Sequence, residues 1–214
     1  MVSRFVAMGM ACAALASTSP AQTIGAWDIA PQVMTTLAGS TPNSVFGGQA
    51  TGIVQSALAV RASTDLLRAG RVHLRYTAQL LPIVYLRGVE QYRELPAAGS
   101  RLYVVSGKTT AYGIGLVPMG LDLAVEVTRR VRVQVGLGAG IYRFSQHVPL
   151  AAGRQRNFSA EWDGTLMFDT GRNRWLQLGV RWKHLSNGFT AYENPGIDNR
   201  MLFAGLSFRI GARR

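Results

Sequence analysis

A histidine and a serine stand two residues apart in the segment His184-Leu185-Ser186-Asn187, and such a pair could carry out acyl transfer. A serine hydroxyl becomes a nucleophile when a neighbouring base takes its proton, and histidine is the most common base at neutral pH. On a β-strand, side chains two residues apart project from one face and are separated by about 6.6 Å along the strand. If residues 174–187 form a strand, His184 can therefore bend toward the Ser186 hydroxyl.

The segment 174–187 has the alternation of a strand with one apolar and one polar face. Its odd positions include three polar side chains: Gln177, Arg181 and Lys183. Its even positions are apolar from residue 176 to residue 182, and His184 and Ser186 continue that even series. A base and a hydroxyl on an apolar, outward-facing wall would meet lipid, so the pattern suggests chemistry on a lipid.

The same period-two alternation recurs along the chain and predicts eight strands. The expected strands are 24–36, 53–64, 72–87, 110–128, 131–146, 156–170, 174–187 and 199–210. Short turns such as 129–130 and 171–173 alternate with longer linkers. We expect those linkers near 37–52, 88–109, 147–156 and 188–198.

Long loops at one end and short turns at the other are typical of outer-membrane barrels. A soluble barrel would show the same alternation with its apolar faces inside. We favour the membrane barrel because several expected strands exceed the roughly 9–11 residues needed to cross a bilayer, and because the final strand is amphipathic. The expected fold is therefore all-β: an eight-stranded antiparallel transmembrane barrel with a polar lumen.

The first 21 residues have the pattern of a secretory signal peptide. Arg4 precedes an apolar stretch from Phe5 to Ala16, which is too short to span a hydrocarbon core of about 30 Å. We expect its removal, so that residues 22–214 form a single barrel domain exported to the outer membrane. Cys12 is the single cysteine and lies in the signal segment, which excludes disulfide scaffolds and cysteine metal sites.

The segment 184–187 and a second motif, at 194–198, together resemble a known family. His184-Leu185-Ser186-Asn187, followed by Asn194-Pro195-Gly196-Ile197-Asp198 and a closing amphipathic strand, is similar to the outer-membrane lipid A 3-O-deacylases, the PagL-like family often labelled acyloxyacyl hydrolases. The resemblance is specific over about residues 174–210 and extends loosely from about residue 110. It implies a barrel with an active site on its lipid-facing wall. It also implies an esterase that removes a 3-O-linked hydroxyacyl chain from lipid A, and so modifies lipopolysaccharide.

The resemblance further implies roles for individual residues. Ser186 would attack the ester carbonyl, His184 would take the hydroxyl proton, and Asp198 would orient His184. Asn187 and Gly188 would donate hydrogen bonds to the oxyanion. This mechanism requires no metal and no cofactor.

Two positions depart from the family pattern. The family's acid is commonly glutamate, and Asp198 is one methylene shorter, so that Glu193 in the same linker is a competing acid. The family also tends to have a glycine two residues after the asparagine. Here Gly188 follows the asparagine directly and Phe189 takes the second place.

Other polar residues have structural interpretations. Glu161, Asp163 and Asp169 share one strand face, and we expect a lumen salt-bridge network there rather than a carboxylate hydrolase site. His73 and His147 have no neighbouring ligand pattern, so we expect no metal site.

The tryptophans of the second half suggest contact with lipid. Trp162, Trp175, Trp182 and Tyr192 are expected to anchor the barrel at the membrane interface, as aromatic belts do. Trp182 is also placed to line a groove for an acyl chain.

The composition fits an ordered, exported, basic protein. The 214 residues include 23 Lys+Arg against 11 Asp+Glu, a formal charge of +12. With 48% hydrophobic and only 16% charged residues, the chain is neither disordered nor a coiled coil. Its arginines do not form a basic cluster with interleaved aromatics, so we expect contacts with lipid A phosphates rather than nucleic acid.

A non-enzymatic structural or adhesive barrel is the alternative function. The esterase and the non-enzymatic barrel are distinguished by whether Asp198 or Glu193 can orient His184. The sequence leaves open which acyl chain is removed, which chain length is preferred and how many copies assemble.

Overall fold

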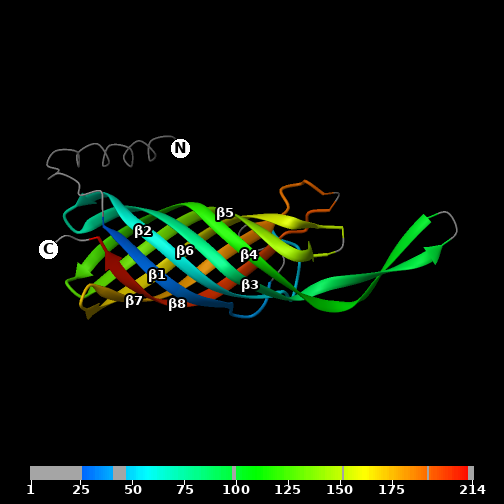
Figure 1. The fold of residues 1–214 in the computed structure, drawn as a ribbon, viewed down its shortest axis with the longest axis horizontal. Coiled ribbons are helices and arrows are strands. Elements are labelled where there is room, and N and C mark those ends of the chain that lie inside the picture. Colours follow the sequence, from blue (N-terminus) through cyan, green and yellow to red (C-terminus); the bar gives the residue numbers. More distant parts are fainter. Residues whose placement is uncertain (1–25, 41–46, 98–99, 151, 192, 212–214) are drawn as a thin grey trace, which may run out of the picture.

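The computed structural model describes residues 26–40, 47–97, 100–150, 152–191 and 193–211, which form a closed antiparallel barrel (Figure 1). Its eight strands are β1 (Trp27–Thr36), β2 (Val54–Ala69), β3 (Val72–Ala97), β4 (Ser100–Thr128), β5 (Val131–Val148), β6 (Arg154–Gly171), β7 (Arg174–Ser186) and β8 (Ile197–Ile210). Each strand pairs with its sequence neighbour, and β8 closes the barrel on β1. The predicted eight-stranded barrel is confirmed. The expected signal peptide lies outside the described residues.

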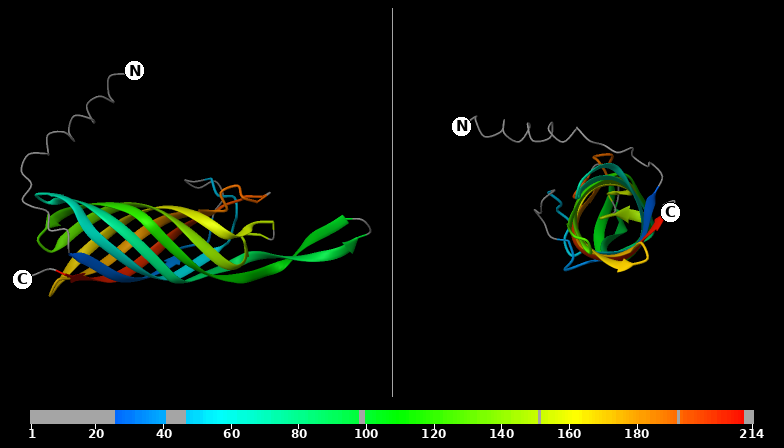
Figure 2. Two further views of the ribbon diagram at one scale, coloured as in Figure 1. Left: turned by 45° about the horizontal axis from the view of Figure 1, so that its top comes forward. Right: turned by 90° about the vertical axis from the view of Figure 1, so that its left-hand side faces the viewer.

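The two ends of the barrel differ, as expected for an outer-membrane protein. Two-residue turns at 70–71, 129–130 and 172–173 join strands at the end where β1 begins and β8 finishes. The β1–β2 and β7–β8 connections and the β3–β4 hairpin lie at the other end (Figure 2). The wall of the barrel therefore separates an end of tight turns from an end of long loops.

The β3–β4 hairpin is the main departure from the sequence-based expectation. We predicted a linker at 88–109, but β3 and β4 stay paired up to Ala97 and Ser100. The hairpin projects well beyond the rest of the barrel (Figures 1 and 2). Its neighbouring residues Val104 and Val105 are both exposed, so neither face of the ladder is buried there. Backbone pairing without a buried face leaves no hydrophobic alternation in the sequence, and the prediction of a linker was wrong for that reason.

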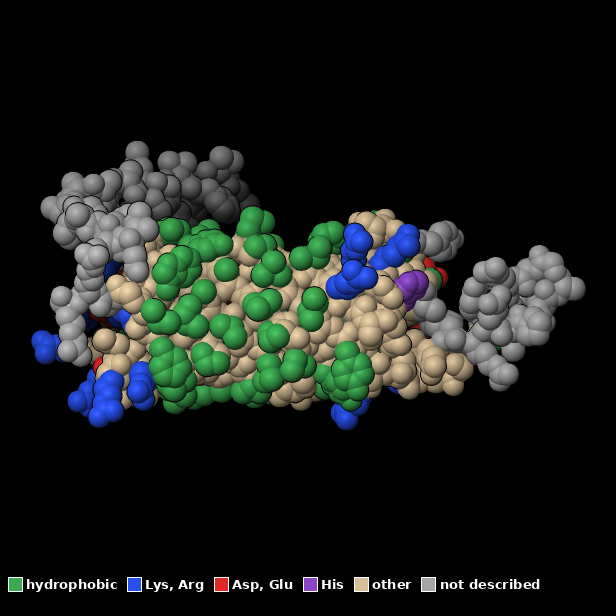
Figure 3. Space-filling view, in the orientation of Figure 1, with side chains coloured by type: hydrophobic (Ala, Val, Ile, Leu, Met, Phe, Trp, Pro, Cys, Tyr) green, Lys and Arg blue, Asp and Glu red, His purple; other side chains and the backbone are tan. Residues whose placement is uncertain are grey.

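Apolar side chains cover the outer wall and polar side chains fill the lumen. On β5, Val135 and Leu137 are more than half exposed, while Gln134 on the opposite face of the same strand is buried. Arg181 and Lys183 of β7 are among the largest fully buried side chains. On the face that Figure 3 shows, hydrophobic side chains cover the middle of the barrel, with lysine and arginine toward both ends. This distribution fits a wall surrounded by lipid.

The charged lumen residues pair with one another. Asp163 accepts hydrogen bonds from Arg61 at 3.1 Å and from Arg181 at 3.0 Å, and Arg181 lies 3.2 Å from Glu161. The predicted lumen network is thus confirmed for Glu161 and Asp163. It is wrong for Asp169, which is exposed at the β6–β7 turn, where it accepts the Gly171 N–H at 2.8 Å.

The expected anchor tryptophans lie on different faces of the wall, and Tyr192, the fourth expected anchor, lies outside the described residues. Trp162 and Trp182 are cross-strand neighbours on the outer wall, and their rings stack with centroids 3.9 Å apart. Trp175 has the odd parity of the lumen residues, and the Arg132 guanidinium lies 4.2 Å from its ring centroid. The interface role expected for Trp175 is therefore wrong, because strand parity directs it inward.

Replacing Asp163 with alanine is expected to destabilise the barrel by about 3 kcal/mol, because the change leaves Arg61 and Arg181 short of a buried carboxylate. Urea unfolding of the barrel in lipid vesicles measures the change. Asp169→Asn at the exposed turn is the matched control and should stay within about 0.5 kcal/mol of the wild type. Equal effects of the two substitutions would contradict the role given to the network.

Candidate active site

His184 and Ser186 project from the outer wall of β7, near the end that carries the long loops. The strand register pairs His184 with Ala160 of β6 and Asp198 of β8, and it pairs Ser186 with Phe158 of β6. The odd-numbered residues that flank them on β7 are buried in the lumen. Both side chains therefore lie on the lipid-facing side, as strand parity predicted.

Asp198 is the hydrogen-bond partner of the His184 imidazole. Its Oδ1 lies 2.5 Å from His184 Nδ1, and its side chain is only 3% exposed. Strand β8 begins at Ile197, two residues earlier than predicted, and this places Asp198 directly opposite His184. The shorter acid thus reaches the imidazole directly. Glu193, the competing acid, is exposed in the loop.

The loop between β1 and β2 covers Asp198 from the other side. The Gly48 N–H donates to Asp198 Oδ2 at 2.8 Å. The loop is held in place by backbone hydrogen bonds from Gln49 to Pro195 and from Ala50 to Gly196, at 2.5 and 3.0 Å. Each carboxylate oxygen therefore has a partner, His184 on one side and Gly48 on the other.

The contact between Gly48 and Asp198 was not predicted from the sequence. The only signal was the Gly47-Gly48 pair within the linker predicted at 37–52, and nothing in the sequence indicates what the glycine approaches. A Cβ on Gly48 would lie 2.7 Å from Asp198 Cγ, so only glycine allows this contact. The Gly48 N–H thus helps to hold the Asp198 carboxylate in its observed place.

Replacing Gly48 with alanine is expected to lower kcat about a hundredfold with little change in KM, because the added methyl group displaces the carboxylate that holds His184. Initial rates with purified protein in detergent measure both constants. Gln49→Ala is the matched control, since Gln49 is exposed in the same loop and contributes its backbone N–H rather than its side chain to the hydrogen bonds there, and its kcat should stay within about twofold of the wild type. A loss of equal size in both variants would assign the effect to the loop rather than to Asp198.

Asn187 organises the loop that follows β7. Its backbone N–H donates to Asn194 Oδ1 at 2.8 Å, and its Nδ2 donates to the Glu193 carbonyl at 2.6 Å. Its own carbonyl accepts the Thr190 hydroxyl at 2.7 Å. The side-chain amide that we expected at the oxyanion therefore closes the loop beside Ser186.

Gly188 and Phe189 form the turn next to Ser186. The Thr190 N–H donates to the Asn187 carbonyl at 3.3 Å, and the two residues between them have φ values of 63° and 60°. Positive φ at both central positions is the pattern of a type I′ turn, in which the central N–H groups are not used by the turn itself. A Cβ on Gly188 would lie 3.0 Å from the Phe158 ring, so the glycine also permits a close approach.

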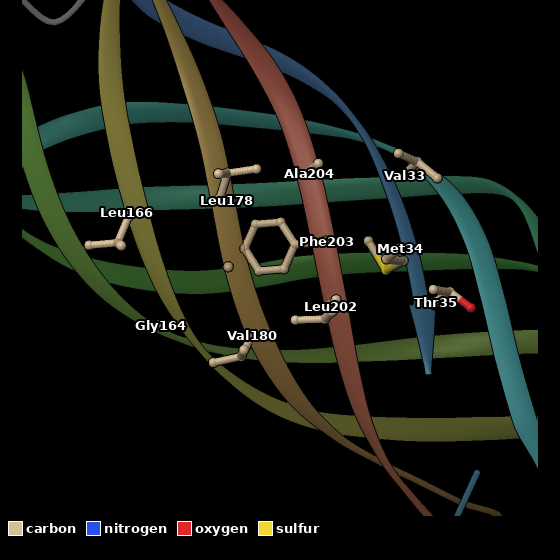
Figure 4. Close-up of a pocket in the computed structure, with 11 residues that line it drawn as sticks. Val33, Met34, Thr35, Gly164, Leu166, Leu178, Val180, Leu202, Phe203 and Ala204 are labelled. Carbon is tan, nitrogen blue, oxygen red and sulfur yellow. The ribbon is translucent and has the colours of Figure 1, made fainter. Parts of the chain in front are cut away.

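An apolar groove lies on the outer wall, but Trp182, which we expected to line such a groove, is not among its lining residues. It has a volume of about 570 Å³ and crosses β6, β7, β8 and β1 (Figure 4). One row of it runs through Gly164, Val180 and Leu202, which are cross-strand neighbours. Gly164 faces outward without a side chain, and this leaves the wall hollow at that point. The groove can accept an aliphatic chain but offers no chemistry of its own.

The described residues supply no metal site. No group of three or more histidine, cysteine, aspartate or glutamate side chains among them is arranged to hold an ion. No helix in the same part of the chain is long and apolar enough to cross a membrane.

The sequence of this chain matches the model of a known protein family. The family model described as lipid A 3-O-deacylase (PagL) matches residues 72–207, which is more than half of the chain. The protein belongs to the PagL family. His184, Ser186 and Asp198 all fall within the matched residues, whereas Gly48 and strands β1 and β2 precede them. The PagL family and the barrel together identify the chain as an outer-membrane protein.

The fold is similar to that of a solved PagL structure. The crystal structure of the outer membrane enzyme PagL aligns with a TM-score of 0.53 and 16% identity, over 83% of this chain and 97% of that one. Neisserial surface protein A aligns with a TM-score of 0.45 and 14% identity, over 87% and 97%. Ail of Yersinia pestis aligns with a TM-score of 0.44 and 8% identity, over 87% and 99%. No curated protein sequence shows a significant match.

Proposed function

We propose that this protein is an outer-membrane serine esterase that removes the 3-O-linked hydroxyacyl chain of lipid A. The hydrogen bond between His184 Nδ1 and Asp198 carries the proposal. A bond of this kind keeps the proton on Nδ1 and makes Nε2 the basic nitrogen, which is the state that a general base needs. Ser186 lies on the same face of β7, two residues away.

In the first step, Nε2 of His184 takes the hydroxyl proton while Ser186 Oγ attacks the ester carbonyl. The new Oγ–C bond moves an electron pair onto the carbonyl oxygen. The Gly188 N–H in the adjacent turn is the proposed donor to that oxyanion. The intermediate then expels the sugar oxygen, which receives the proton from His184 Nε2 and leaves as a hydroxyl group. The acyl group remains on Ser186 as an acyl-enzyme.

In the second step, His184 takes a proton from water, and the resulting hydroxide attacks the acyl-enzyme. Collapse of this intermediate returns the proton to Ser186 Oγ and releases the free hydroxy fatty acid. Asp198 stabilises the imidazolium in both steps and is itself held by the Gly48 N–H.

The position of the site on the outer wall fits a substrate that never leaves the membrane. His184 and Ser186 lie near the loop end of β7, where the ester groups of a lipid meet its headgroup. The apolar groove begins four residues from His184, at Val180, about 13 Å along the same face. Acyl chains of the substrate can therefore extend along the wall while the ester stays beside Ser186.

Mass spectrometry of lipid A from cells that express the protein tests the proposal. The expected result is the loss of one hydroxyacyl mass relative to cells with an empty vector, and fragmentation of the product should place the loss at the 3-position. Unchanged lipid A, with the barrel folded in the outer membrane, would contradict the proposed activity. It would instead favour a structural or adhesive barrel.

A further inference from the structure

Two arginines face each other on the outer wall beside the candidate active site. Arg143 of β5 and Arg156 of β6 are directly opposite in the strand register, and both are exposed. Their neighbours Tyr142 and Phe144 are buried in the lumen, so strand parity directs Arg143 outward. Directly opposite residues have Cβ atoms about 4.5–5.5 Å apart, so two positive charges share one place on the wall.

Neither arginine has a carboxylate partner among the described residues, unlike the arginines of the lumen. Each of five other arginines forms an ion pair with an acid: Arg61, Arg75, Arg132, Arg181 and Arg209. Like charges directly opposite each other on neighbouring strands destabilise a sheet. A bound anion would remove that repulsion.

The arginine pair lies at the end of the apolar wall. The preceding outward pair on the same strands is Ile141 with Phe158, and both of these side chains are exposed hydrophobic groups. Figure 3 shows lysine and arginine side chains gathered where the hydrophobic band ends on the loop side. This depth is the level of lipid headgroups rather than of acyl chains.

Ser186 lies close to the arginine pair on the same outer face of the wall. Phe158 is directly opposite Ser186, and Arg156 stands two residues from Phe158 on the same strand. Arg156 and Ser186 are therefore diagonal neighbours, about 7–8 Å apart. A molecule whose ester lies at Ser186 can place a second polar group between the two guanidinium groups.

We infer that Arg143 and Arg156 form a binding site for a phosphate group carried by the lipid substrate. The planar guanidinium donates pairs of parallel hydrogen bonds that match phosphate oxygens, and two of them neutralise its charge. Arg154 is not part of this site, because its guanidinium donates to the Thr190 carbonyl at 3.0 and 2.8 Å and so holds the loop after β7. The inference rests on the proposed function and adds to it the headgroup that the enzyme recognises.

The test compares phosphorylated lipid A with enzymatically dephosphorylated lipid A of the same acylation. Arg143→Gln combined with Arg156→Gln should raise KM for the phosphorylated substrate about tenfold, with kcat nearly unchanged. On the dephosphorylated substrate, the double variant and the wild type should behave alike. The matched control is Arg87→Gln, an exposed arginine on β3. It should leave KM for both substrates at the wild-type value.

Three outcomes would overturn the inference: an unchanged KM in the double variant, an equal rise in KM for both substrates, or an equal rise in the Arg87 variant. Millimolar inorganic phosphate is added as a separate arm. If it raises the wild-type KM as much as the double substitution does, the site takes free phosphate, and the assignment to a lipid headgroup fails.

Binding is measured in parallel, so that failure of the proposed function can be told apart from failure of this inference. The Ser186→Ala protein is titrated with both forms of lipid A, with and without the two arginine substitutions. Tighter binding of the phosphorylated form that depends on the arginines supports the phosphate site even if no deacylation occurs. Equal binding of both forms overturns it.

Discussion

Ser186→Ala is expected to lower the rate of lipid A deacylation by about a thousandfold or more, because it removes the oxygen that forms the acyl-enzyme. Ser186 lies on the outer wall, and no other described residue depends on its hydroxyl for a hydrogen bond given by the structure. The barrel should therefore fold as the wild type does. Release of hydroxy fatty acid from purified lipid A in detergent measures the rate, and the heat-dependent migration of the barrel on a gel measures folding.

Ser145→Ala provides the control for the loss of a hydroxyl group on the outer wall. Ser145 is exposed on β5 and accepts the Tyr112 N–H at 3.1 Å, but it lies away from His184. This variant should keep its rate within about twofold of the wild type. If Ser186→Ala keeps a comparable rate, the nucleophile is a different group and the proposed mechanism fails.

Asp198→Asn is expected to lower kcat by roughly a thousandfold or more with little change in KM. The amide has the same shape as the carboxylate, so it can still accept the Gly48 N–H through its oxygen. Its nitrogen then donates to His184 Nδ1, which moves the imidazole proton to Nε2 and leaves no base facing the serine. Steady-state kinetics with purified protein separates this loss of kcat from a loss of binding.

Glu193→Gln is the control for the second candidate acid. Glu193 is exposed, and its backbone carbonyl rather than its carboxylate takes part in the loop. We expect its kcat to stay within about twofold of the wild type. A larger loss in this variant than in Asp198→Asn would transfer the orienting role to Glu193.

Strand parity predicted the direction of the candidate catalytic side chains from the sequence. The alternation of β7 placed His184 and Ser186 on the apolar face, because residues of one parity must share a face of a strand. It did not predict which residue of β8 lies opposite His184, because register depends on how the whole barrel closes. Asp198 came from the family resemblance, and its direct contact with His184 from the strand register.

Contacts between distant segments were beyond the sequence. Gly48 and Asp198 are 150 positions apart, and only the folded loop between β1 and β2 brings them together. Trp175 was wrongly expected at the membrane interface for a different reason. That prediction rested on the residue type alone, whereas the odd position of Trp175 on its strand directs the side chain into the lumen. The β3–β4 hairpin was missed for a third reason, because a ladder exposed on both faces has no pattern of burial to detect.

The lumen network has a consequence for the permeability of the cell envelope. Arg61 of β2 reaches Asp163 of β6, and Arg181 of β7 meets the same carboxylate, so side chains cross the interior from opposite walls. An eight-stranded barrel filled in this way holds no continuous column of water. We therefore expect this barrel not to serve as a pore for solutes. Any change in the cell envelope would come from its action on lipid.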